Sequence, residues 1–454
     1  MAINVTFGDY NPTEEEDILA IKVDIDLYFD GTGNNMVNIK ERAMNTPAFQ
    51  KNGMSDDEDT SYYDDRSNVA RLWETSSQET KIYIDGIGTE ERQQDSKKLG
   101  GAFGTGPTGV KGKVRIGCEK VAATVKKQVD KTGAVKVTML TLDVFGFSRG
   151  AAAARNFVHE VGRAAHKSKL QTIVVGRSAI TQRQDSEGNV TSLEELPAWG
   201  LLGQELKKKG IKVDALRVRF LGLFDTVSSY SRYFSVSPNF GNDIKELHLN
   251  HIGHARTIIH FTAQDEHREN FSLTHVPMGI EKSFPGVHSD IGGSYKDGPE
   301  VIKQLETSWT TRTKLDVFAR KLIEDGWYKE HELSITATNL FLALKGTRER
   351  VTNTYSYIPL QFMADIGISK GIPFRTAVLE NKYSINKDAL LLRVKKRLKT
   401  YIFDGGPAYV FVPNSELPEQ KDLRDLRNKY LHWSSTREGL GMDPNSDRKR
   451  VTYN

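Results

Sequence analysis

The sequence predicts an α/β fold, with a mainly parallel sheet flanked by helices and with inserted and C-terminal helical regions. Over the first 300 residues, β-branched and aromatic runs of strand length are interspersed with helical patterns. One such run turns sharply at Gly146 to Gly150 and continues as an alanine-rich helix. In addition, Ser148, Asp225 and His288 each follow a predicted strand, at the sheet edge where the catalytic groups of such folds collect.

Length and composition exclude several classes of protein. At 454 residues, the chain suits one large catalytic domain with an appended region better than several small domains. A net charge of +4, from 63 basic and 59 acidic residues, creates no strong field for nucleic acid, so no such partner is expected. The single cysteine, Cys118, excludes an internal disulfide framework and a cysteine-rich metal site. The first residues lack the basic start and apolar core of a signal peptide, so we expect synthesis in the cytoplasm.

The chain divides into regions of different character. Residues 1–20 form a polar lead-in, and residues 21–300 are expected to form the catalytic core. Within the core, residues 167–210 are polar and irregular, and we interpret them as an insertion. Residues 301–454 are predicted to be mainly helical, to complete the core in part and to contact a membrane surface. The helices expected there are Leu315 to Glu324, Tyr357 to Ile368 and Ala389 to Leu398, followed by a basic tail without a recognised sorting signal.

The first predicted strand, Ile21 to Phe29, alternates apolar and polar side chains, so one of its faces is expected to be buried. It leads into Asp30-Gly31-Thr32-Gly33-Asn34-Asn35, a loop whose glycines leave backbone N–H groups free to point at a ligand. An ordinary turn also suits this composition. The position after an early strand favours a second oxyanion donor, from Gly31 or Thr32, with Asp30 in a supporting role.

A glycine-rich stretch precedes the serine motif. From Gly100 to Gly112, six of thirteen residues are glycine, and Gly104, Gly106 and Gly109 match the dinucleotide pattern GxGxxG. That pattern needs a strand before it and a helix opening inside it, and we predict neither, so we interpret the stretch as a loop near the active site. An apolar stripe then predicts a helix carrying Val114, Cys118, Val121, Val125 and Val129.

The turn around Ser148 has the pattern of a nucleophile elbow. A serine is lifted clear of its strand only on a strained turn, which presses the strand against the following helix and requires small residues at Gly146 and Gly150. Ser148 would then lie at a helix N-terminus, where the backbone N–H of Arg149 and the helix dipole stabilise an oxyanion. The bare GxSxG pattern is a weak signal, and the strand before it and the helix after it supply the necessary context.

Ser148, Asp225 and His288 stand in the order serine, acid, histidine that α/β-hydrolases use. The buried strand Leu216 to Phe224 delivers Asp225, and the short strand Met278 to Pro285 opens into the glycine-rich loop of His288. We predict that Ser148 is the nucleophile, that His288 takes and returns its proton, and that Asp225 fixes the imidazole tautomer.

Two features after Asp225 leave alternatives open. Asp290 competes with Asp225 for the role of triad acid, but we expect it to bind the backbone N–H groups of its own loop and to hold the loop's shape. His248, His251 and His254 follow one another at a spacing of three and could line one side of a helix. Because no acidic or cysteine ligand accompanies them, we expect neither a metal site nor another cofactor.

Five segments of the chain together resemble a known family. They are YFDGTGNN at Tyr28 to Asn35, YIDGIGT at Tyr83 to Thr89, FGFSRGAAAAR at Phe145 to Arg155, FLGLFDTV at Phe220 to Val227 and FPGVHSDIGGSY at Phe284 to Tyr295. The set is similar to the GxSxG phospholipase effectors of bacterial type VI secretion, which are built on an α/β-hydrolase catalytic domain. The resemblance implies hydrolysis of phospholipid acyl esters, delivery through the secretion spike into a neighbouring cell's periplasm, and neutralisation by a cognate immunity protein.

The leading prediction is therefore an antibacterial, secreted serine hydrolase of the phospholipase A type, which acts at a membrane surface through an acyl-enzyme. A second hypothesis keeps the enzyme and changes the substrate to a soluble ester or thioester. A third is a catalytically idle hydrolase fold that serves as a binding protein, and the intact serine, acid and histidine argue against it. A nucleotide-dependent oxidoreductase would depend on the glycine pattern alone.

Overall fold

The structure is a computed structural model of the whole chain, and it describes residues 19–55, 60–96, 106–175, 178–185, 190–228, 240–337, 340–438 and 441–454. The predicted lead-in lies outside the described residues up to position 18. The same holds for residues 97–105, which include the first six residues of the glycine-rich stretch.

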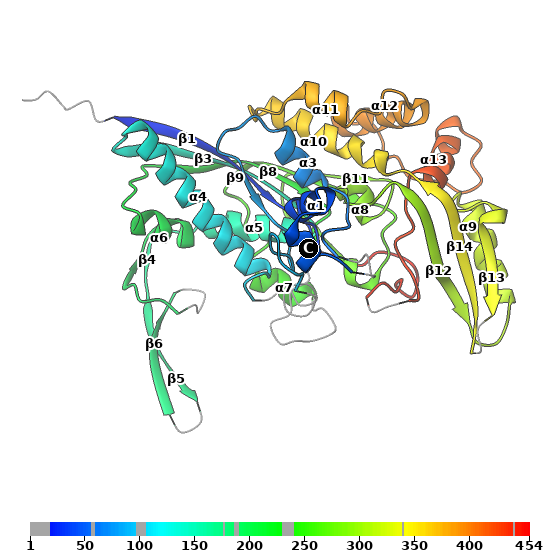
Figure 1. Cartoon of the computed structure of the whole chain (residues 1–454), viewed down its shortest axis with the longest axis horizontal. Coiled ribbons are helices and arrows are strands. Elements are labelled where there is room, and N and C mark those ends of the chain that lie inside the picture. The colour runs from blue at the N-terminus through cyan, green and yellow to red at the C-terminus, as the bar shows by residue number, and fades with distance from the viewer. Residues whose placement is uncertain are drawn as a thin grey trace, which may run out of the picture.

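A six-stranded sheet forms the centre of the molecule (Figure 1). Its strand order is β11-β9-β8-β3-β1-β2, and every neighbouring pair is parallel. The strands are β1 (Ala20–Phe29), β2 (Ile82–Ile84), β3 (Lys136–Phe147), β8 (Leu216–Phe224), β9 (Ala255–Ala263) and β11 (Ile280–Phe284). A parallel sheet with helices on its faces confirms the predicted α/β class.

Helices cover both faces of this sheet (Figure 1). One face packs against α4, α5 and α6, and the other packs against α3, α10 and α12. Their bounds are α3 (Asn68–Thr75), α4 (Val110–Thr132), α5 (Arg149–Val161), α6 (Gly200–Lys208), α10 (Tyr357–Ser369) and α12 (Ala389–Phe403). The apolar stripe expected after residue 112 lies on α4 and enters the core, as predicted.

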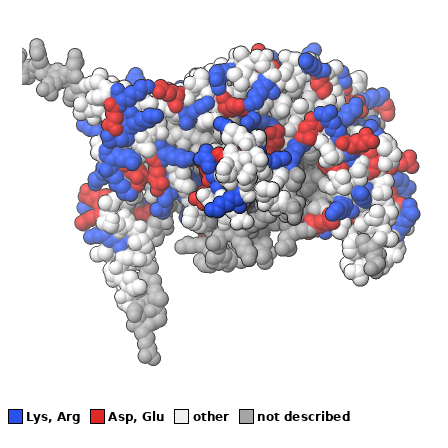
Figure 2. Space-filling view, in the orientation of Figure 1, with Lys and Arg blue, Asp and Glu red and all other residues white. Residues whose placement is uncertain are grey.

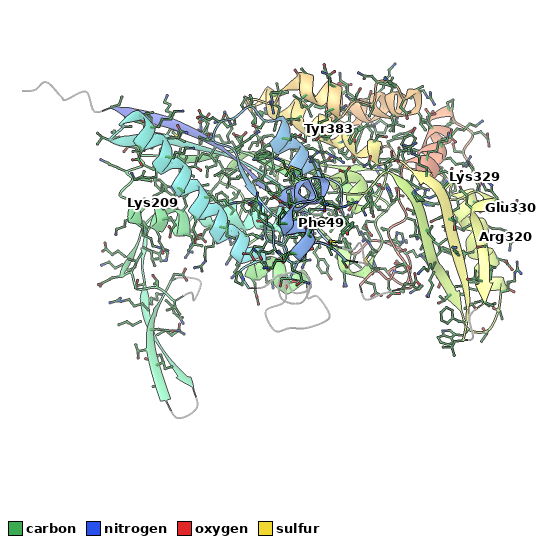
Figure 3. The ribbon with its side chains drawn as sticks, in the orientation of Figure 1. Phe49, Lys209, Arg320, Lys329, Glu330 and Tyr383 are labelled. Atoms are coloured by element: carbon green, nitrogen blue, oxygen red, sulfur yellow. The ribbon has the colours of Figure 1, made fainter. Side chains whose placement is uncertain are left out.

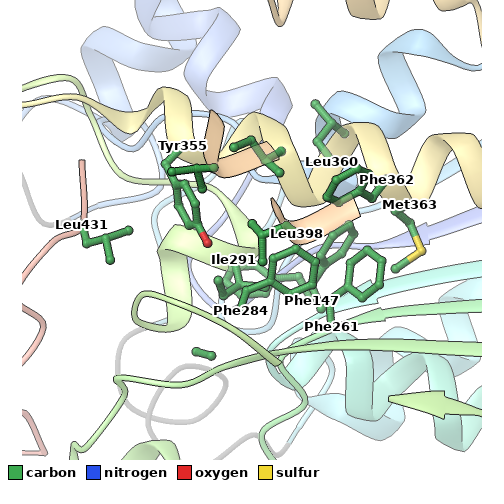
Figure 4. Close-up of a cluster of buried hydrophobic side chains, with 14 of the residues drawn as sticks. Phe147, Phe261, Phe284, Ile291, Tyr355, Leu360, Phe362, Met363, Leu398 and Leu431 are labelled. Carbon is green, nitrogen blue, oxygen red and sulfur yellow. The ribbon is translucent and has the colours of Figure 1, made fainter. Parts of the chain in front are cut away.

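The two faces of the sheet carry different cores, because successive side chains of a strand point to opposite faces. In β3, Leu140, Leu142 and Val144 join an aliphatic cluster with α4 and α5. Phe145 and Phe147 of the same strand join an aromatic cluster with α10 and α12 on the other face (Figure 4). The residue before the predicted nucleophile is thus a fully packed aromatic, which holds the serine turn against the core.

The first strand is buried on both faces near its C-terminal end, so the half-buried strand predicted from its alternation is wrong there. Asp26 and Tyr28 are only 1% and 0% exposed. The Asp26 carboxyl accepts hydrogen bonds from the Tyr28 hydroxyl at 3.2 Å and from Ser76 Oγ at 2.9 Å. Burial, together with the nearby carboxylate of Asp143, raises the pKa of Asp26 to about 7. Asp26 and Tyr28 therefore mark a buried hydrogen-bond network and not a solvent-facing surface.

Residues 167–210, expected to be irregular, contain regular structure. β4 (His166–Lys167) pairs with β7 (Glu195–Leu196), β5 (Lys169–Val175) pairs with β6 (Ser178–Gln184), and α6 follows. The β5–β6 hairpin projects away from the body of the molecule (Figure 1). Leu170 and Ile180 in it remain exposed, so no buried face imposed an alternating pattern that the sequence could reveal.

The region after residue 300 contains the three predicted helices, as α9 (Thr313–Glu324), α10 and α12, and also a sheet that was not predicted. β12 (Gly298–Ser308), β14 (Leu342–Val351) and β13 (Leu333–Ala337) pair in that order, antiparallel, and project from the far end of the molecule (Figure 1). The pairing of β12 with β14 shifts register twice, which breaks the alternation that identifies a strand.

The remaining elements complete the layers. They are α1 (Met36–Ala43), α2 (Pro47–Asn52), α7 (Phe240–Glu246), α8 (His288–Gly292), α11 (Thr376–Lys382), α13 (Pro418–Lys429), β10 (Leu273–Thr274) and β15 (Thr452–Tyr453). Tyr383, labelled in Figure 3, directly follows α11. Its hydroxyl donates to Glu74 of α3 at 2.6 Å and so connects α11 to α3.

The visible face of the molecule carries charges of both signs. Basic and acidic side chains are interspersed over the visible face of the molecule (Figure 2). Among the described residues, none of the helices combines the length and the apolar character needed to cross a bilayer.

Candidate active site

Ser148 lies on a strained turn between β3 and α5. Its φ of 58° and ψ of −130° fall where non-glycine residues rarely occur, so the surrounding packing must hold the turn. A Cβ added at Gly146 would lie 2.6 Å from the backbone of α5, and one added at Gly150 would lie 2.1 Å from the carbonyl oxygen of Asp30. The close approach of strand, helix and the loop after β1 therefore requires glycine at both positions.

The structure brings Asp225 and His288 together beside this turn. His288 Nδ1 lies 2.5 Å from Asp225 Oδ2, and both residues are almost fully buried, at 3% and 0% exposure. The His288 ring packs against Phe147 with the ring centroids 4.6 Å apart, and Phe147 directly precedes Ser148. Asp225 directly follows β8 and His288 begins α8, so the ends of these two elements position the pair.

Arg450, in the basic tail, forms a bidentate ion pair with Asp225. Its two terminal nitrogens lie 2.6 and 2.8 Å from the two carboxylate oxygens, and the backbone N–H of Ala263 donates to Oδ1 at 2.8 Å. The tail is held in place because β15 pairs with β10, and because Arg450 Nε donates to the carbonyl oxygen of Phe271 at 2.8 Å. Burial alone would raise the pKa of Asp225, but Arg450 and His288 hold this pKa well below its ordinary value.

Burial sets the protonation state of His288. It lowers the pKa of the imidazole below 6.5, the neighbouring Asp225 carboxylate opposes the shift in part, and Arg268 adds to it. The ring is thus neutral at pH 7, with its Nδ1 proton directed at Asp225. The backbone N–H of His288 donates to buried Glu266 at 3.2 Å, and Glu266 is paired with Arg268 at 2.8 Å.

Asp290 has different partners from Asp225. Its carboxylate accepts the backbone N–H of Val287 at 3.0 Å and lies 2.8 Å from Nδ1 of His432. The His432 ring in turn stacks on Tyr295 with 4.0 Å between centroids. These contacts connect the histidine loop to the C-terminal region, and they agree with a role for Asp290 in holding the loop.

The loop after β1 is shaped by the buried carboxyl of Asp30. It accepts hydrogen bonds from Ser67 Oγ, from the Tyr83 hydroxyl at 2.5 Å and from the backbone N–H of Gly31 at 2.7 Å. Burial raises the pKa of Asp30 to about 6, against the lowering effect of these three donors. The Gly31 N–H is therefore directed at Asp30, which argues against the predicted use of Gly31 as an oxyanion donor.

Two backbone N–H groups remain for that purpose. In the described part of the chain, neither the N–H of Thr32 nor that of Arg149 has a hydrogen-bond partner. The Arg149 side chain joins the two segments, since its Nε donates to Thr32 Oγ1 at 2.7 Å. Thr32 and Arg149 are accordingly held next to each other on either side of the serine turn.

The three histidines at a spacing of three do not lie on a helix. They follow the end of α7, and His248 has a φ of +49°, which interrupts any helical path. His248 and His251 instead meet His159 of α5, whereas the His254 ring packs over Gly162. The expectation of a shared helix face is therefore wrong, and a different histidine joins the group.

Sequence reasoning missed the charged residues around the pair of Asp225 and His288. Arg450 lies in a tail whose composition resembles a solvated basic run, and Glu266 and Arg268 lie in a polar loop after β9. No motif marks these positions. The only signal is charge close to a predicted strand end, which most surface loops share.

The parallel sheet, the strained serine turn and the acid and histidine from later strands together define the α/β-hydrolase class of fold. A family model described as "T6SS, Phospholipase effector Tle1-like, catalytic domain" matches residues 25–313, well over half of the chain. The chain therefore belongs to the Tle1-like phospholipase effectors of the type VI secretion system, a family of secreted lipolytic hydrolases. The predicted family is confirmed.

A solved structure supports the fold. It is described as the structure of the Tle1 effector bound to the VgrG spike from the type 6 secretion system, and it matches with a TM-score of 0.61 and 19% identity, covering 99% of this chain and 98% of the other. An uncharacterized protein from Pseudomonas aeruginosa is a weaker match, with a TM-score of 0.41 and 16% identity over 89% of this chain and 52% of that one. No curated protein matches the sequence.

Proposed function

We propose that the protein is an antibacterial phospholipase A that cleaves acyl esters of membrane phospholipids through a serine, histidine and aspartate mechanism. The observation that carries the proposal is the buried pair of Asp225 and His288 beside the positive-φ turn of Ser148. A buried carboxylate directed at Nδ1 leaves Nε2 of a neutral imidazole to accept a proton, which is what activation of a serine requires.

In the proposed reaction, His288 Nε2 takes the hydroxyl proton while Ser148 Oγ attacks the acyl carbonyl carbon. The backbone N–H groups of Thr32 and Arg149 bind the oxyanion that forms. The intermediate collapses when the bond to the glycerol oxygen breaks, and His288 returns the proton to that oxygen. Water then attacks the acyl-enzyme by the same route and releases a fatty acid. Asp225 keeps the imidazole in one tautomer and stabilises its positive charge throughout.

Delivery and partners are proposed from the family. The solved relative of similar fold is bound to a VgrG spike, which supports a spike protein as a partner of this chain. Family membership supports action in the periplasm of a target cell, at its phospholipid surface, and protection of the producing cell by a cognate immunity protein.

The test is to incubate the purified chain with vesicles of mixed phospholipids and to identify the products by mass spectrometry. We expect a fatty acid and a lysophospholipid in equal amounts. Ser148→Ala should release neither product, whereas Ser334→Ala, at an exposed serine of β13, should behave as wild type. Faster turnover of a short soluble ester than of vesicles would favour the soluble ester or thioester hypothesis. No turnover of either substrate would favour the idle binding protein.

A further inference from the structure

Three histidines from two separate segments converge outside the active site. His159 lies in the last turn of α5, and His248 and His251 lie between α7 and β9. One ring nitrogen from each lies within 4.8 Å of the others, His159 and His248 are half-buried, and His251 is exposed. The ring centroids are 4.3, 5.3 and 5.4 Å apart. We call this group the histidine triangle.

The segments that carry the histidine triangle are joined by hydrogen bonds from the neighbouring residues of α5. Arg155 Nε donates to the carbonyl oxygen of Leu249 at 2.9 Å, and its Nη2 donates to Asn250 Oδ1 at 3.2 Å. Asn156 Nδ2 donates to the carbonyl oxygen of Leu247 at 2.9 Å. The three rings are thus presented by backbone that is fixed before any ligand arrives, and such preorganisation favours specific binding.

We propose that the histidine triangle binds a divalent transition-metal ion, with Zn²⁺ as the fitting ion. Imidazole nitrogens suit zinc, cobalt, nickel and copper, whereas calcium and magnesium prefer oxygen ligands. With zinc–nitrogen bonds of about 2.0–2.1 Å, tetrahedral ligand nitrogens lie about 3.3–3.4 Å apart. Rotations of the side chains close the remaining gap, since no ring is fully buried. Exposed His251 leaves the fourth position open to water.

The surroundings suit a cation. His159 lies at the C-terminal end of α5, where the helix dipole is negative and favours positive charge. His248 adopts a left-handed backbone conformation, with φ +49°, which turns the chain so that His248 and His251 both reach His159.

The role of this ion is structural, because it lies too far from the ester to take part in cleavage. Ser148 and His159 are eleven positions apart along α5, about 16 Å at 1.5 Å per residue. A bound ion joins the far end of the helix that begins at Ser148 to the connection between Asp225 and β9. It therefore stabilises the arrangement of these two segments in the folded state.

The test uses the untagged full-length protein, freed of metal with a chelator and titrated with Co²⁺ and with Zn²⁺. We expect one Co²⁺ per chain, with the intense visible absorption of a tetrahedral site, and displacement of the cobalt by zinc. We also expect Zn²⁺ to raise the midpoint of thermal unfolding, because the ion binds the folded state.

The matched variants are His251→Ala and His331→Ala. Both positions are exposed, so both proteins should fold, but only His251 belongs to the histidine triangle. His251→Ala should weaken zinc binding at least tenfold and abolish the thermal shift, and His331→Ala should change neither. His159→Ala should repeat the loss from the other segment. The proposal is overturned if wild type binds neither ion at micromolar concentrations, or if His251→Ala and His159→Ala bind zinc as tightly as wild type does.

Discussion

The replacement Arg450→Gln tests whether the C-terminal tail is part of the active site. From the described residues Asp225 accepts four hydrogen bonds, and two of them come from the Arg450 guanidinium at 2.6 and 2.8 Å. The side chains of Arg450 and Asp225 are only 6% and 0% exposed, so water screens this pair little. Removing one partner of such a buried pair leaves an uncompensated charge, and we expect the free energy of unfolding to fall by about 3–5 kcal/mol.

The same change should alter catalysis. A carboxylate that has lost two of its four donors is free to shift, and a misplacement of about 1 Å in a catalytic constellation lowers kcat by about 100-fold. Loss of a nearby positive charge also raises the pKa of Asp225 and favours the imidazolium form of His288. The acid limb of the pH profile of kcat/KM should therefore move to higher pH. A purely structural role for Arg450 would not move it.

The measurements are urea unfolding and the rate of hydrolysis of a short soluble ester as a function of pH. Arg350→Gln is the matched control, because Arg350 also forms a bidentate pair, with Asp297 at 2.8 and 2.6 Å, but is 68% exposed. That control should leave stability and activity close to wild type. Arg450→Lys should recover part of both losses, since it keeps the charge. An Arg450→Gln protein with wild-type stability, kcat and pH profile would refute the reasoning.

Four further outcomes are expected. Ser148→Ala should abolish ester hydrolysis while leaving the thermal unfolding midpoint unchanged; retained turnover would end the serine mechanism. Asp225→Asn should lower kcat by about 10⁴-fold, because the amide favours the wrong histidine tautomer. Asp290→Asn should lower the thermal unfolding midpoint and leave kcat close to that of wild type. The reverse pattern would exchange the two roles. Gly31→Val places a Cβ 2.4 Å from the ring of Phe147, so the loop must shift and carry the neighbouring Thr32 N–H with it. Because that N–H is a proposed oxyanion donor, kcat should fall on the order of 100-fold with little change in KM. The value of kcat/KM should rise with pH and then level off, and the midpoint of the rise should lie below pH 6.5. The reason is that neutral His288 is the active form and that burial lowers its pKa. A midpoint above pH 6.5 contradicts this account.

Most of the central sheet could be predicted from the sequence, because buried parallel strands are continuous apolar runs. The strand Leu216–Phe224 has the bounds expected for it. The strand Ala255–Ala263 was not predicted, since its buried His260 made the segment look polar. His260 is satisfied internally, by the backbone N–H of Thr226 at 3.0 Å and by Glu281 at 2.8 Å. Such pairing depends on distant residues and leaves no local pattern.

In the candidate site, too, some features could be predicted from a local pattern and others depend on residues distant in the sequence. The serine turn depends on glycines within two residues of Ser148, so a local motif reveals it. The order of serine, acid and histidine followed from strand ends, and the structure brings Asp225 to His288; the catalytic roles stay predictions. The choice between Gly31 and Thr32 as the second oxyanion donor depends on the orientation of the Asp30 carboxyl, which accepts the Gly31 N–H. The spacing of residues in the sequence does not reveal that orientation.

The pairing of the tail with the centre of the fold also bears on how the protein matures during its synthesis. Asp225 and Arg450 are separated by 225 positions, whereas the six sheet strands are complete once residue 284 has been made. All six strands and the serine turn are therefore made while the partner of Asp225 is still missing. Contacts between residues so distant in sequence form at a low rate, because the entropy of closing the loop must be lost before the contact stabilises the chain. The acid and histidine thus reach their final electrostatic environment only after residue 450 has been made.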